Sequence, residues 1–539
     1  MNPSLRDSHA STDQSGVDRA SAAEDTALQD VVAELGIALE SRNWRGAVGL
    51  IGQHWSALLD RPGDLLDDAL RRIPLSAFEH DTRAAAVRDI RLHSSADAVD
   101  RMLGDVPVPD AGDLVALEAI ARSERALSLL SVASARMIAF RVRGRLVSAT
   151  RLAELVERFG RIAVVHQPAL LTDRLPAALL QAGITRGLAD DIPGALITLR
   201  DAYERGPGAR VRYVERDAAG KAAFFSSLAG DLDQAEVWLE RLDASPPAHG
   251  WFGPRVALTA DIARAVIATE MLNHDAAAAA LGQLDQPVNA EQGWGAGVTF
   301  ARARYALAWG DRLSAIEMVR RDRARYADWL GESSALGPML AQAEVELLLS
   351  VGQLQKARRA VASDPSQPAS IIALARMELV SGSYDLAARH AAAALARPQS
   401  SRIRTEALAI LAPAQRRVSD PAAAAQTAAH LRDAIRANGL SFVGVGVPAE
   451  DRRELELDQN DPTRAVRDPF TVLEQPIRIT RQQSIVLQGL EKGWSLREIA
   501  TREHLSHNTM KTHARGLYQR LGVSSRDEAI ARAYEVGLL

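Results

Sequence analysis

The spacing of hydrophobic positions predicts helices along almost the whole chain. From about residue 26 to residue 442, apolar residues recur with the period of amphipathic helices, in segments of ten to eighteen residues separated by helix-breaking positions. Alanine is abundant and aromatic residues make up only 4% of the chain, which favours closely packed helices over sheets. We therefore expect an all-α fold.

A short sequence pattern recurs at near-regular intervals within this helical region. It consists of a turn residue followed five positions later by a small alanine. The copies are Gly144 with Ala149, Asp190 with Ala195, Gly230 with Ala235, Asn273 with Ala278, Gly310 with Ala315, Gly352 with Ala357 and Gly382 with Ala387, and an outlying early copy runs from Arg42-Asn43-Trp44 to Ala47. Successive turn residues are 46, 40, 43, 37, 42 and 30 positions apart from the first of the seven onward. A left-handed residue ends one helix, and the small alanine lets the next helix pack closely and antiparallel. Between residues 48 and 143 we find helices but no clear repeat.

The repeat resembles the tetratricopeptide-type helical hairpins of MalT-like regulators. The resemblance implies a solenoid over residues 26–442, because a single hairpin cannot bury its apolar face alone. Residues 1–25 are rich in Ser and Asp and are expected to be disordered. Residues 443–476 carry Gly, Pro and mixed charges without periodicity, which predicts a linker with one short helix near residues 451–457.

Four short amphipathic helices are predicted between residues 477 and 539. Three of them are preceded by a capping box, formed by Thr480 with Gln483, Ser495 with Glu498, and Ser525 with Glu528. Ser506 can cap the remaining helix, over about residues 507–521. The short connection at residues 503–505 suits a helix-turn-helix, whose second helix enters the DNA major groove.

The helix at residues 507–521 separates an apolar face from a polar one. The apolar stripe consists of Met510, Leu517 and Leu521, and the polar face carries Lys511, Thr512 and Arg515. From residue 504 to residue 526 the chain has four basic residues and no acidic one. A charged helix face is most often only solvated. Here the caps, the turn, the stripe and the single sign of charge agree on a DNA-binding unit.

The segment from residue 479 to residue 539 resembles the DNA-binding domain of LuxR-type transcription regulators. The positions that match the family pattern are Gly493-Trp494-Ser495, Glu498-Ile499-Ala500, Ser506, Thr509, Lys511, His513 and Leu521-Gly522-Val523. The departures are Gln482-Gln483 in place of Arg-Glu, Met510 in place of Val, and Glu503-His504 where the family prefers Leu and an aromatic residue. Gln483 can still close a capping box, and Met510 keeps its position apolar.

This resemblance implies a role for individual residues. It places Lys511, Thr512 and Arg515 at base edges, and Arg497, Thr509 and His513 at phosphates. Arg515 is chemically suited to guanine O6 and N7, and Lys511 to guanine or phosphate. Ser506 puts the amides of the helix N-terminus, which favour an anion, near the DNA backbone. The last helix, residues 526–536, is the dimer surface in the family, so a homodimer would read an inverted repeat in double-stranded DNA.

Charge and composition set further limits. The chain of 539 residues has a net charge of −4, with +3 on residues 473–539 and −7 on the remainder. This asymmetry fits a DNA-contacting tail on a body without general affinity for polyanions. Cysteine is absent, so we expect neither a disulfide nor a thiolate site. No apolar run reaches eighteen residues and the first thirty residues lack a signal-peptide core, so a cytoplasmic protein without a membrane partner is expected.

Sequence signatures of enzymatic chemistry do not occur. The chain has no phosphate-binding loop, no G-x-S-x-G and no H-E-x-x-H string. Gly220-Lys221 is followed by Ala222 and is expected on a surface helix, and Gly444-Val445-Gly446 lacks a third glycine and is expected to be a flexible loop. His504 and His507 have no neighbours in the sequence that would complete a metal shell. We therefore expect no NTPase module, catalytic residue, cofactor or metal.

The tryptophans of the helical region have two interpretations. They are Trp44, Trp55, Trp238, Trp251, Trp294, Trp309 and Trp329. Large aromatic residues in a helical solenoid line a ligand groove in some proteins, but more often they fill the interfaces between helices. We expect core packing.

Together these observations favour a sequence-specific, DNA-binding transcription regulator controlled through its helical-repeat domain. The ligand or protein that acts on the repeats is not identified by the sequence, and RNA polymerase is a further candidate partner. One alternative is a helical-repeat scaffold whose tail has lost DNA binding and contacts only proteins. Another is an enzyme with an unrecognised helical active site. The operator, and whether transcription rises or falls, stay open.

Overall fold

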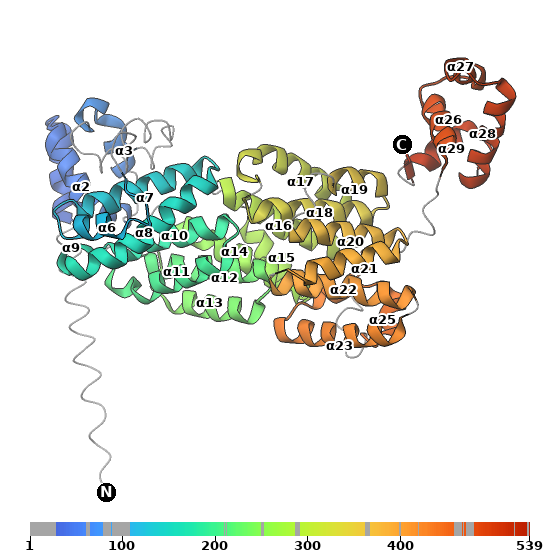
Figure 1. Ribbon diagram of the computed structural model, residues 1–539. Coiled ribbons are helices and arrows are strands. Elements are labelled where there is room, and N and C mark those ends of the chain that lie inside the picture. Colours follow the sequence, from blue (N-terminus) through green and yellow to red (C-terminus); the bar gives the residue numbers. More distant parts are fainter. Residues whose placement is uncertain are drawn as a thin grey trace, which may run out of the picture. The chain divides into compact units, whose positions relative to one another are not determined.

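The computed structural model of the protein is built from helices (Figure 1). It describes residues 29–60, 65–78, 88, 108–209, 211, 213–248, 253–285, 292–331, 333–361, 367–397, 400–418, 420–457, 466, 468–470, 479–521, 523–535 and 538–539. No strand occurs in these ranges, which confirms the expected all-α fold. No helix in the same ranges is both long and apolar enough to cross a membrane. The predicted disordered segment, residues 1–25, lies outside the described residues.

The first half of the chain, after a helical segment at residues 29–40, contains helices of very different lengths. They are α2 (Trp44–Asp60), α3 (Leu65–Arg72), η1 (Leu75–Phe78), α6 (Leu114–Ala121), α7 (Ala126–Val142), α8 (Leu146–His166), α9 (Pro168–Leu171), α10 (Leu175–Leu188), α11 (Ile192–Glu204), η2 (Gly206–Gly208), α12 (Val214–Ala229), α13 (Leu232–Ala244) and α14 (Gly253–Glu270).

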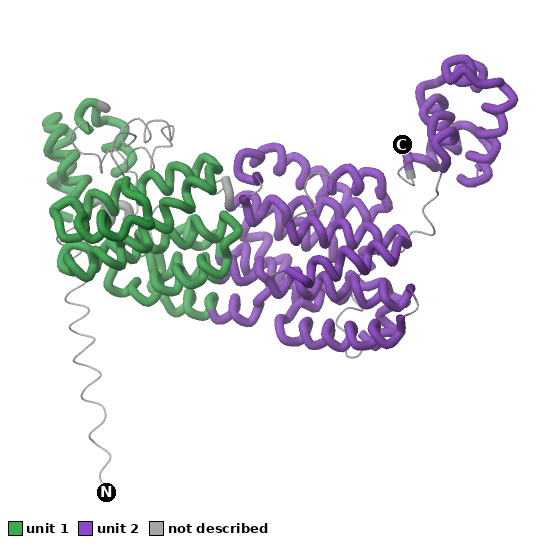
Figure 2. The backbone as a smooth tube through the Cα atoms, in the orientation of Figure 1, with its two compact units in different colours: residues 1–222, 238–259 green, residues 223–237, 260–539 purple. Residues whose placement is uncertain are grey.

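The second half continues in the same way and ends in a group of four helices. The elements are α15 (His274–Gln283), α16 (Gln292–Ala308), α17 (Arg312–Arg325), η3 (Ala327–Trp329), α18 (Leu336–Ser350), α19 (Leu354–Val361), α20 (Pro368–Val380), α21 (Tyr384–Leu395), α22 (Ser401–Arg417), α23 (Pro421–Asn438), α24 (Ser441–Val445), α25 (Ala449–Glu454), α26 (Arg481–Glu491), α27 (Leu496–Arg502), α28 (His507–Leu521) and α29 (Arg526–Glu535). The chain forms two compact units, residues 1–222 with 238–259 and residues 223–237 with 260–539 (Figure 2).

Consecutive helices pack as hairpins around the turns that the sequence marks, for example α7 with α8, α10 with α11 and α20 with α21. At Gly144, φ is +72°, and the two backbone bonds of a helix-ending Schellman motif are present, from Gly144 N–H to the Arg141 carbonyl and from Arg145 N–H to the Phe140 carbonyl. Asp190, Gly230, Gly352 and Gly382 are also left-handed. The alanines five positions later are buried, namely Ala149, Ala195, Ala235, Ala357 and Ala387.

Three copies of the turn pattern are instructive. In the early copy, Arg42 is left-handed with φ +54° and Ala47 is buried, as expected. The copy assigned to Asn273 and Ala278 is wrong by one position, because Leu272 carries the positive φ and Ala277 is the fully buried alanine. Asn273 instead caps α15, accepting a hydrogen bond from the Ala276 N–H. At Gly310 the pattern holds for the buried Ala315, but Gly310 is not among the left-handed residues.

Part of the segment predicted as a linker, residues 443–476, is packed. Phe442, Val445, Val466 and Phe470 are buried in one hydrophobic cluster with residues of α16–α20, and α24 and α25 lie in this stretch. The Gly444–Gly446 run, expected to be a flexible loop, belongs to α24 and its C-cap. The prediction failed because valines and phenylalanines in short, irregular elements bury apolar area without a helical period in the sequence.

Polar contacts also attach the described residues of this segment, 441–457, 466 and 468–470, to the helices before it. Arg376 donates from Nη1 to the Gly446 carbonyl at 2.8 Å, and its guanidinium lies 5.0 Å from the centre of the Phe470 ring. The buried Asp451 pairs with Arg416 and Arg417. The short helix expected near residues 451–457 is observed as α25, slightly earlier in the chain.

Helix α12 corrects another expectation. Gly220-Lys221 was predicted to lie on a surface helix, but Lys221 is only 3% exposed and its Nζ lies 2.5 Å from Asp217 Oδ1. Every residue from 217 to 230 is buried. The tryptophans behave as expected where the structure describes them, since Trp238, Trp294 and Trp329 are buried and Trp44 and Trp309 pack against core clusters. The side chains of Trp55 and Trp251 lie outside the described residues.

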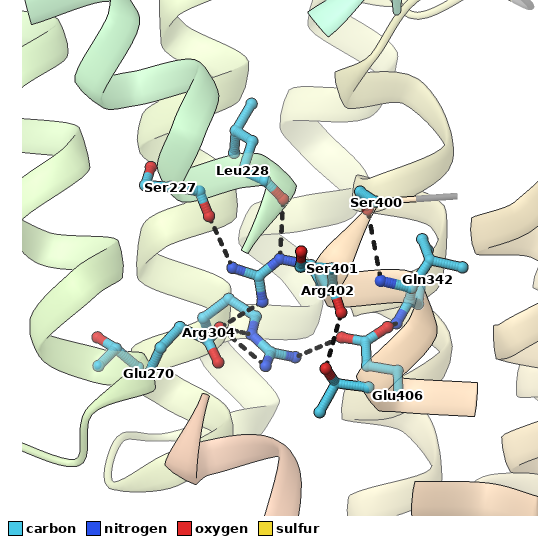
Figure 3. A network of polar contacts seen from close by, with 12 residues as sticks. Ser227, Leu228, Glu270, Arg304, Gln342, Ser400, Ser401, Arg402 and Glu406 are labelled. Atoms are coloured by element: carbon cyan, nitrogen blue, oxygen red, sulfur yellow. Dashed lines mark hydrogen bonds and ion pairs between the residues drawn. The ribbon is translucent and has the colours of Figure 1, made fainter. Parts of the chain in front are cut away.

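A network of buried charges lies within the second unit (Figure 3). Glu270, at the end of α14, accepts hydrogen bonds from Arg304 at 2.9 Å and from Arg402 at 2.6 Å. Arg402 also donates to the carbonyls of Ser227 and Leu228, each at 3.0 Å. Each nitrogen of the Arg402 guanidinium therefore has an oxygen partner.

The carboxylates on the other side of Arg304 extend this network. Arg304 lies 3.2 Å from Glu346 and 4.0 Å from Glu406, and the Gln342 amide donates to both of these residues, at 3.0 and 2.7 Å. Burial would raise the pKa of Glu270, but the charges of Arg304 and Arg402 outweigh it and lower that pKa. Burial, followed by the charge of Glu346, raises the pKa of Glu406.

Candidate nucleic-acid interface

The C-terminal domain, residues 479–539, is a group of four helices with a hydrophobic core of its own. Helix α28 contacts α26, α27 and α29. The core contains Val486, Leu487, Leu490, Ile499, Ala500, Met510, Ala514, Leu517, Leu521, Ala529 and Ala533. The stripe predicted on α28, Met510 with Leu517 and Leu521, is confirmed as the buried face of that helix.

Two of the three predicted capping boxes are confirmed. Thr480 and Gln483 exchange hydrogen bonds of 2.9 and 3.3 Å at the start of α26, and Ser495 and Glu498 exchange bonds of 2.7 and 3.3 Å at the start of α27. Because the Ser495 backbone N–H donates to its carboxylate, the pKa of Glu498 is lowered. These bonds fix where each helix begins.

The cap of α29 differs from the prediction. Ser525 Oγ does accept from the Glu528 N–H at 3.3 Å, but the Glu528 carboxylate accepts mainly from the backbone N–H of Ser524, at 2.9 Å. The reciprocal bond therefore reaches one residue further back. The backbone N–H of Ser524 lowers the pKa of Glu528 in the same way.

The connection between α27 and α28 is short, and a left-handed residue and a backbone hydrogen bond define its turn. His504 has φ +55°, and the Leu505 N–H donates to the Ala500 carbonyl, which ends α27. Glu503 and His504 are exposed, whereas Leu505 packs against the domain core. Ser506 then caps α28, as expected, because its hydroxyl accepts from the Thr509 N–H at 3.1 Å. Among the described residues, no group of three metal-ligand side chains forms.

A close approach between α26 and α28 holds the candidate recognition helix in place. Gln483 of α26 is 6% exposed and accepts a hydrogen bond from Arg520 of α28 at 3.2 Å. A Cβ atom at Gly516 would lie 2.9 Å from the Gln483 amide nitrogen, so the glycine permits this contact. The orientation of α28 is therefore set by both its apolar stripe and a partly buried polar contact.

The outward face of α28 lies opposite its apolar stripe. Asn508, Thr512, Arg515 and Gln519 recur at i, i+4, i+7 and i+11 and are all exposed, with Lys511 beside them. Within the described residues, the side chains of Lys511 and Arg515 form no ion pair or hydrogen bond. The Thr512 hydroxyl donates to the Asn508 carbonyl at 3.0 Å, so its hydrogen is used inside the helix.

The remaining predicted site residues lie around this face. Arg497 is exposed near the start of α27, and Ser506 and Thr509 are exposed at the start of α28, where their hydroxyls lie 2.7 Å apart. His513 is partly buried. The sequence prediction missed Asn508 and Gln519, although the spacing from Thr512 and Arg515 would have placed both on the outward face.

Trp494, in the turn between α26 and α27, is covered by cations. The Arg502 guanidinium lies 4.0 Å from its ring centre and the Lys492 ammonium lies 5.2 Å from it. Gly493, with φ +85°, makes the preceding turn possible. The tryptophan is partly buried and packs against the core of the domain.

Comparison with known proteins agrees with this architecture. Residues 478–533 match the model of the bacterial regulatory proteins of the luxR family. The chain is similar to the probable transcriptional regulatory protein SgaR of Hyphomicrobium methylovorum, with 33% identity over 110 residues. That similarity covers 19% of this chain, and the chain spans about half, 49%, of the relative. The C-terminal helices of this chain therefore form a luxR-family helix-turn-helix domain.

Proposed function

We propose that the protein is a sequence-specific, DNA-binding transcription regulator and that α28 enters the major groove. The exposed face of α28 carries this proposal, because Lys511 and Arg515 project there without a partner among the described residues. A cation that the fold does not neutralise is available to a phosphate or to a base edge. The name of the similar regulator SgaR supports the same function.

Individual residues are proposed to divide between base reading and anchoring. Lys511, Thr512 and Arg515 face the bases, with Arg515 donating to guanine O6 and N7. Arg497, Thr509 and His513 contact phosphates, and the free amides at the N-terminus of α28, capped by Ser506, favour a phosphate oxygen. The first group sets the sequence and the second sets the position of the domain on DNA.

The test is selection of bound sequences from a random duplex pool by the full chain. The selected duplex and a scrambled duplex of equal length are then compared for affinity at several salt concentrations. We expect a defined motif, tighter binding to it than to the scrambled duplex, and affinity that falls as salt rises. A chain that enriches no sequence and binds neither duplex would support the alternative, a helical-repeat scaffold without DNA binding.

Two variants separate the proposed anchoring contacts from base contacts. Thr509→Ala should weaken binding to both duplexes by similar factors, because phosphates carry no sequence information. Lys511→Ala should lower the slope of log affinity against log salt by about one if its partner is a phosphate. If Lys511 instead contacts a base, the ratio of affinities for the two duplexes should fall.

We further propose that residues 26–442 are a tetratricopeptide-like sensor or interaction domain that regulates the DNA-binding domain. We also propose that the protein is cytoplasmic. The burial of Phe442, Val445, Val466 and Phe470 against the preceding helices supports a mechanical connection between the repeats and the DNA-binding domain. Phe470 is buried against the preceding helices, and Thr480 already caps α26. The chain between them spans at most about 35 Å when fully extended. The DNA-binding domain therefore works within a short distance of its anchor at Phe470.

Dimerisation through α29 on an inverted repeat completes the proposal. The buried side of α29 is occupied by Ala529 and Ala533, while Tyr534 is 53% exposed. A fragment of residues 470–539 should bind the selected duplex because its core is self-contained. Its affinity or its dimerisation, measured by sedimentation, should differ from that of the full chain. Identical behaviour of fragment and full chain under all conditions would contradict regulation by the repeats.

A further inference from the structure

The outward stripe of α28 carries two side-chain amides, Asn508 and Gln519, which differ chemically from Thr512 and Arg515. Arg515 has donors only, and the Thr512 hydroxyl already donates to the Asn508 carbonyl at 3.0 Å. Asn508 carries a donor and an acceptor on one amide, and neither has a partner among the described residues. Gln519 has the same amide group but lies three turns further along the helix.

The position of Asn508 decides which of the two amides reaches a base. Recognition helices contact base edges with their N-terminal residues. Asn508 is the second residue of α28 and shares its face with Thr512 and Arg515. The asparagine side chain is short. Its amide can therefore reach the floor of the groove only from the first turn of the helix. Gln519 lies where such a helix moves away from the bases.

We infer that Asn508 reads an adenine in each half-site, through hydrogen bonds to N6 and N7. In the major groove, adenine presents a donor and an acceptor side by side, which is the pattern that an asparagine amide matches. Guanine presents two acceptors there, which match Arg515 instead. This inference rests on the proposed function, because it assigns a base to a residue of the same helix.

The helix geometry also sets the spacing between the two bases. Asn508 and Arg515 are seven residues apart, which corresponds to about 10 Å along the helix axis. Zinc-finger helices read three successive bases from helix positions −1, 3 and 6, so two base-reading residues about two turns apart reach the first and third base. Each half-site should therefore contain an adenine and a guanine about two or three base pairs apart.

The experiment uses the full chain, its Asn508→Ala and Gln519→Ala variants, and the same random duplex pool. The wild-type motif should contain the adenine and guanine at this spacing. Replacing that adenine in the selected duplex should cost the wild-type chain about 5- to 150-fold in affinity, the range of a good bidentate contact. The same replacement should cost Asn508→Ala about twofold or less, while its preference for guanine persists.

Gln519→Ala is the matched control, because it removes the same amide from the same face and should leave the adenine preference intact. Asn508 is exposed and alanine favours helices, so Asn508→Ala should fold normally, which its circular dichroism will verify. A wild-type motif without this adenine, or full adenine discrimination by Asn508→Ala, overturns the inference and leaves the proposed function standing. Failure of the wild-type chain to select any motif overturns both.

Discussion

Two sets of cations in this protein have opposite surroundings. In the buried network of the second unit, Arg304 and Arg402 are almost inaccessible and their guanidiniums meet carboxylates and backbone carbonyls. On α28, Lys511 and Arg515 are exposed, and their side chains form no ion pair or hydrogen bond among the described residues. The residue type is nearly the same in both places, so the surroundings decide whether a cation holds the fold together or is available to a partner.

Energetics explain why the two sets cannot exchange roles. Removing a charge from water costs several kcal/mol, so the charge of a buried arginine has to be offset by carboxylates and hydrogen-bond acceptors around it. Burial would lower the pKa of Arg304, but the carboxylates of Glu270, Glu346 and Glu406 outweigh it and raise that pKa. An exposed cation keeps its hydration and loses it only when a ligand replaces the water. Substitutions in the buried network should therefore lower the stability of the fold, whereas substitutions of the exposed cations on α28 should lower the affinity for DNA.

The largest effect should come from Glu270→Ala. This change leaves Arg304 and Arg402 without their shared carboxylate in a fully buried position, and breaking such a pair costs about 3–5 kcal/mol. Urea unfolding of the full chain, followed by circular dichroism, should show a clear loss of stability. Glu317→Ala serves as control, because that exposed carboxylate lies 3.7 Å from Arg320 at the surface and should change stability by less than about 1 kcal/mol. Similar losses for both variants would contradict the structural role of the network.

Arg515→Ala should behave in the opposite way. The side chain is exposed, so unfolding of the chain should be unchanged within about 0.5 kcal/mol. If it contacts a guanine, affinity for the selected duplex should fall by about 1–3 kcal/mol, with little change on scrambled DNA. Fluorescence anisotropy with both duplexes measures the ratio directly. A ratio equal to that of the wild type would show that Arg515 does not read a base.

The same contrast explains which features the sequence could predict. The face of α28 was predictable because Met510, Leu517 and Leu521 fix the buried side from local spacing alone. The hairpin turns were predictable from Gly and Asp positions for the same local reason. The buried network was not, since Arg402 meets carbonyls at residues 227 and 228, far away in the chain. Packing of Phe470 against the preceding helices is likewise a long-range contact, which left residues 443–476 looking like a linker.

A smaller effect is expected from helix caps in the DNA-binding domain. Ser495→Ala removes the hydroxyl that accepts from the Glu498 N–H, and losing such a cap costs about 1 kcal/mol. Ser506→Ala removes the equivalent bond at α28, so thermal unfolding of the residue 470–539 fragment should show losses of similar size. Only the Ser506 variant should also weaken DNA binding beyond its effect on folding, because Ser506 lies at the proposed phosphate contact. If Ser495→Ala and Ser506→Ala lose equal stability and also weaken DNA binding equally, the phosphate contact assigned to Ser506 is contradicted.

The smallest effect should be the acid sensitivity contributed by Glu498. Its pKa is lowered from 4.5 because the Ser495 backbone N–H donates to the carboxylate, so the charged form is favoured in the folded domain. This contribution to stability is complete above the unfolded pKa and is lost as pH falls through the lowered folded pKa. Glu498→Gln keeps an acceptor but cannot titrate, so unfolding of the fragment below about pH 4.5 should depend less steeply on pH than in the wild type. Glu503→Gln is the control, since Glu503 is an exposed carboxylate on the adjoining turn and accepts no hydrogen bond among the described residues. An unchanged slope in Glu498→Gln would mean that the bond to Ser495 does not stabilise the charged carboxylate in solution, and the start of α27 would then rest on the Ser495 hydroxyl alone.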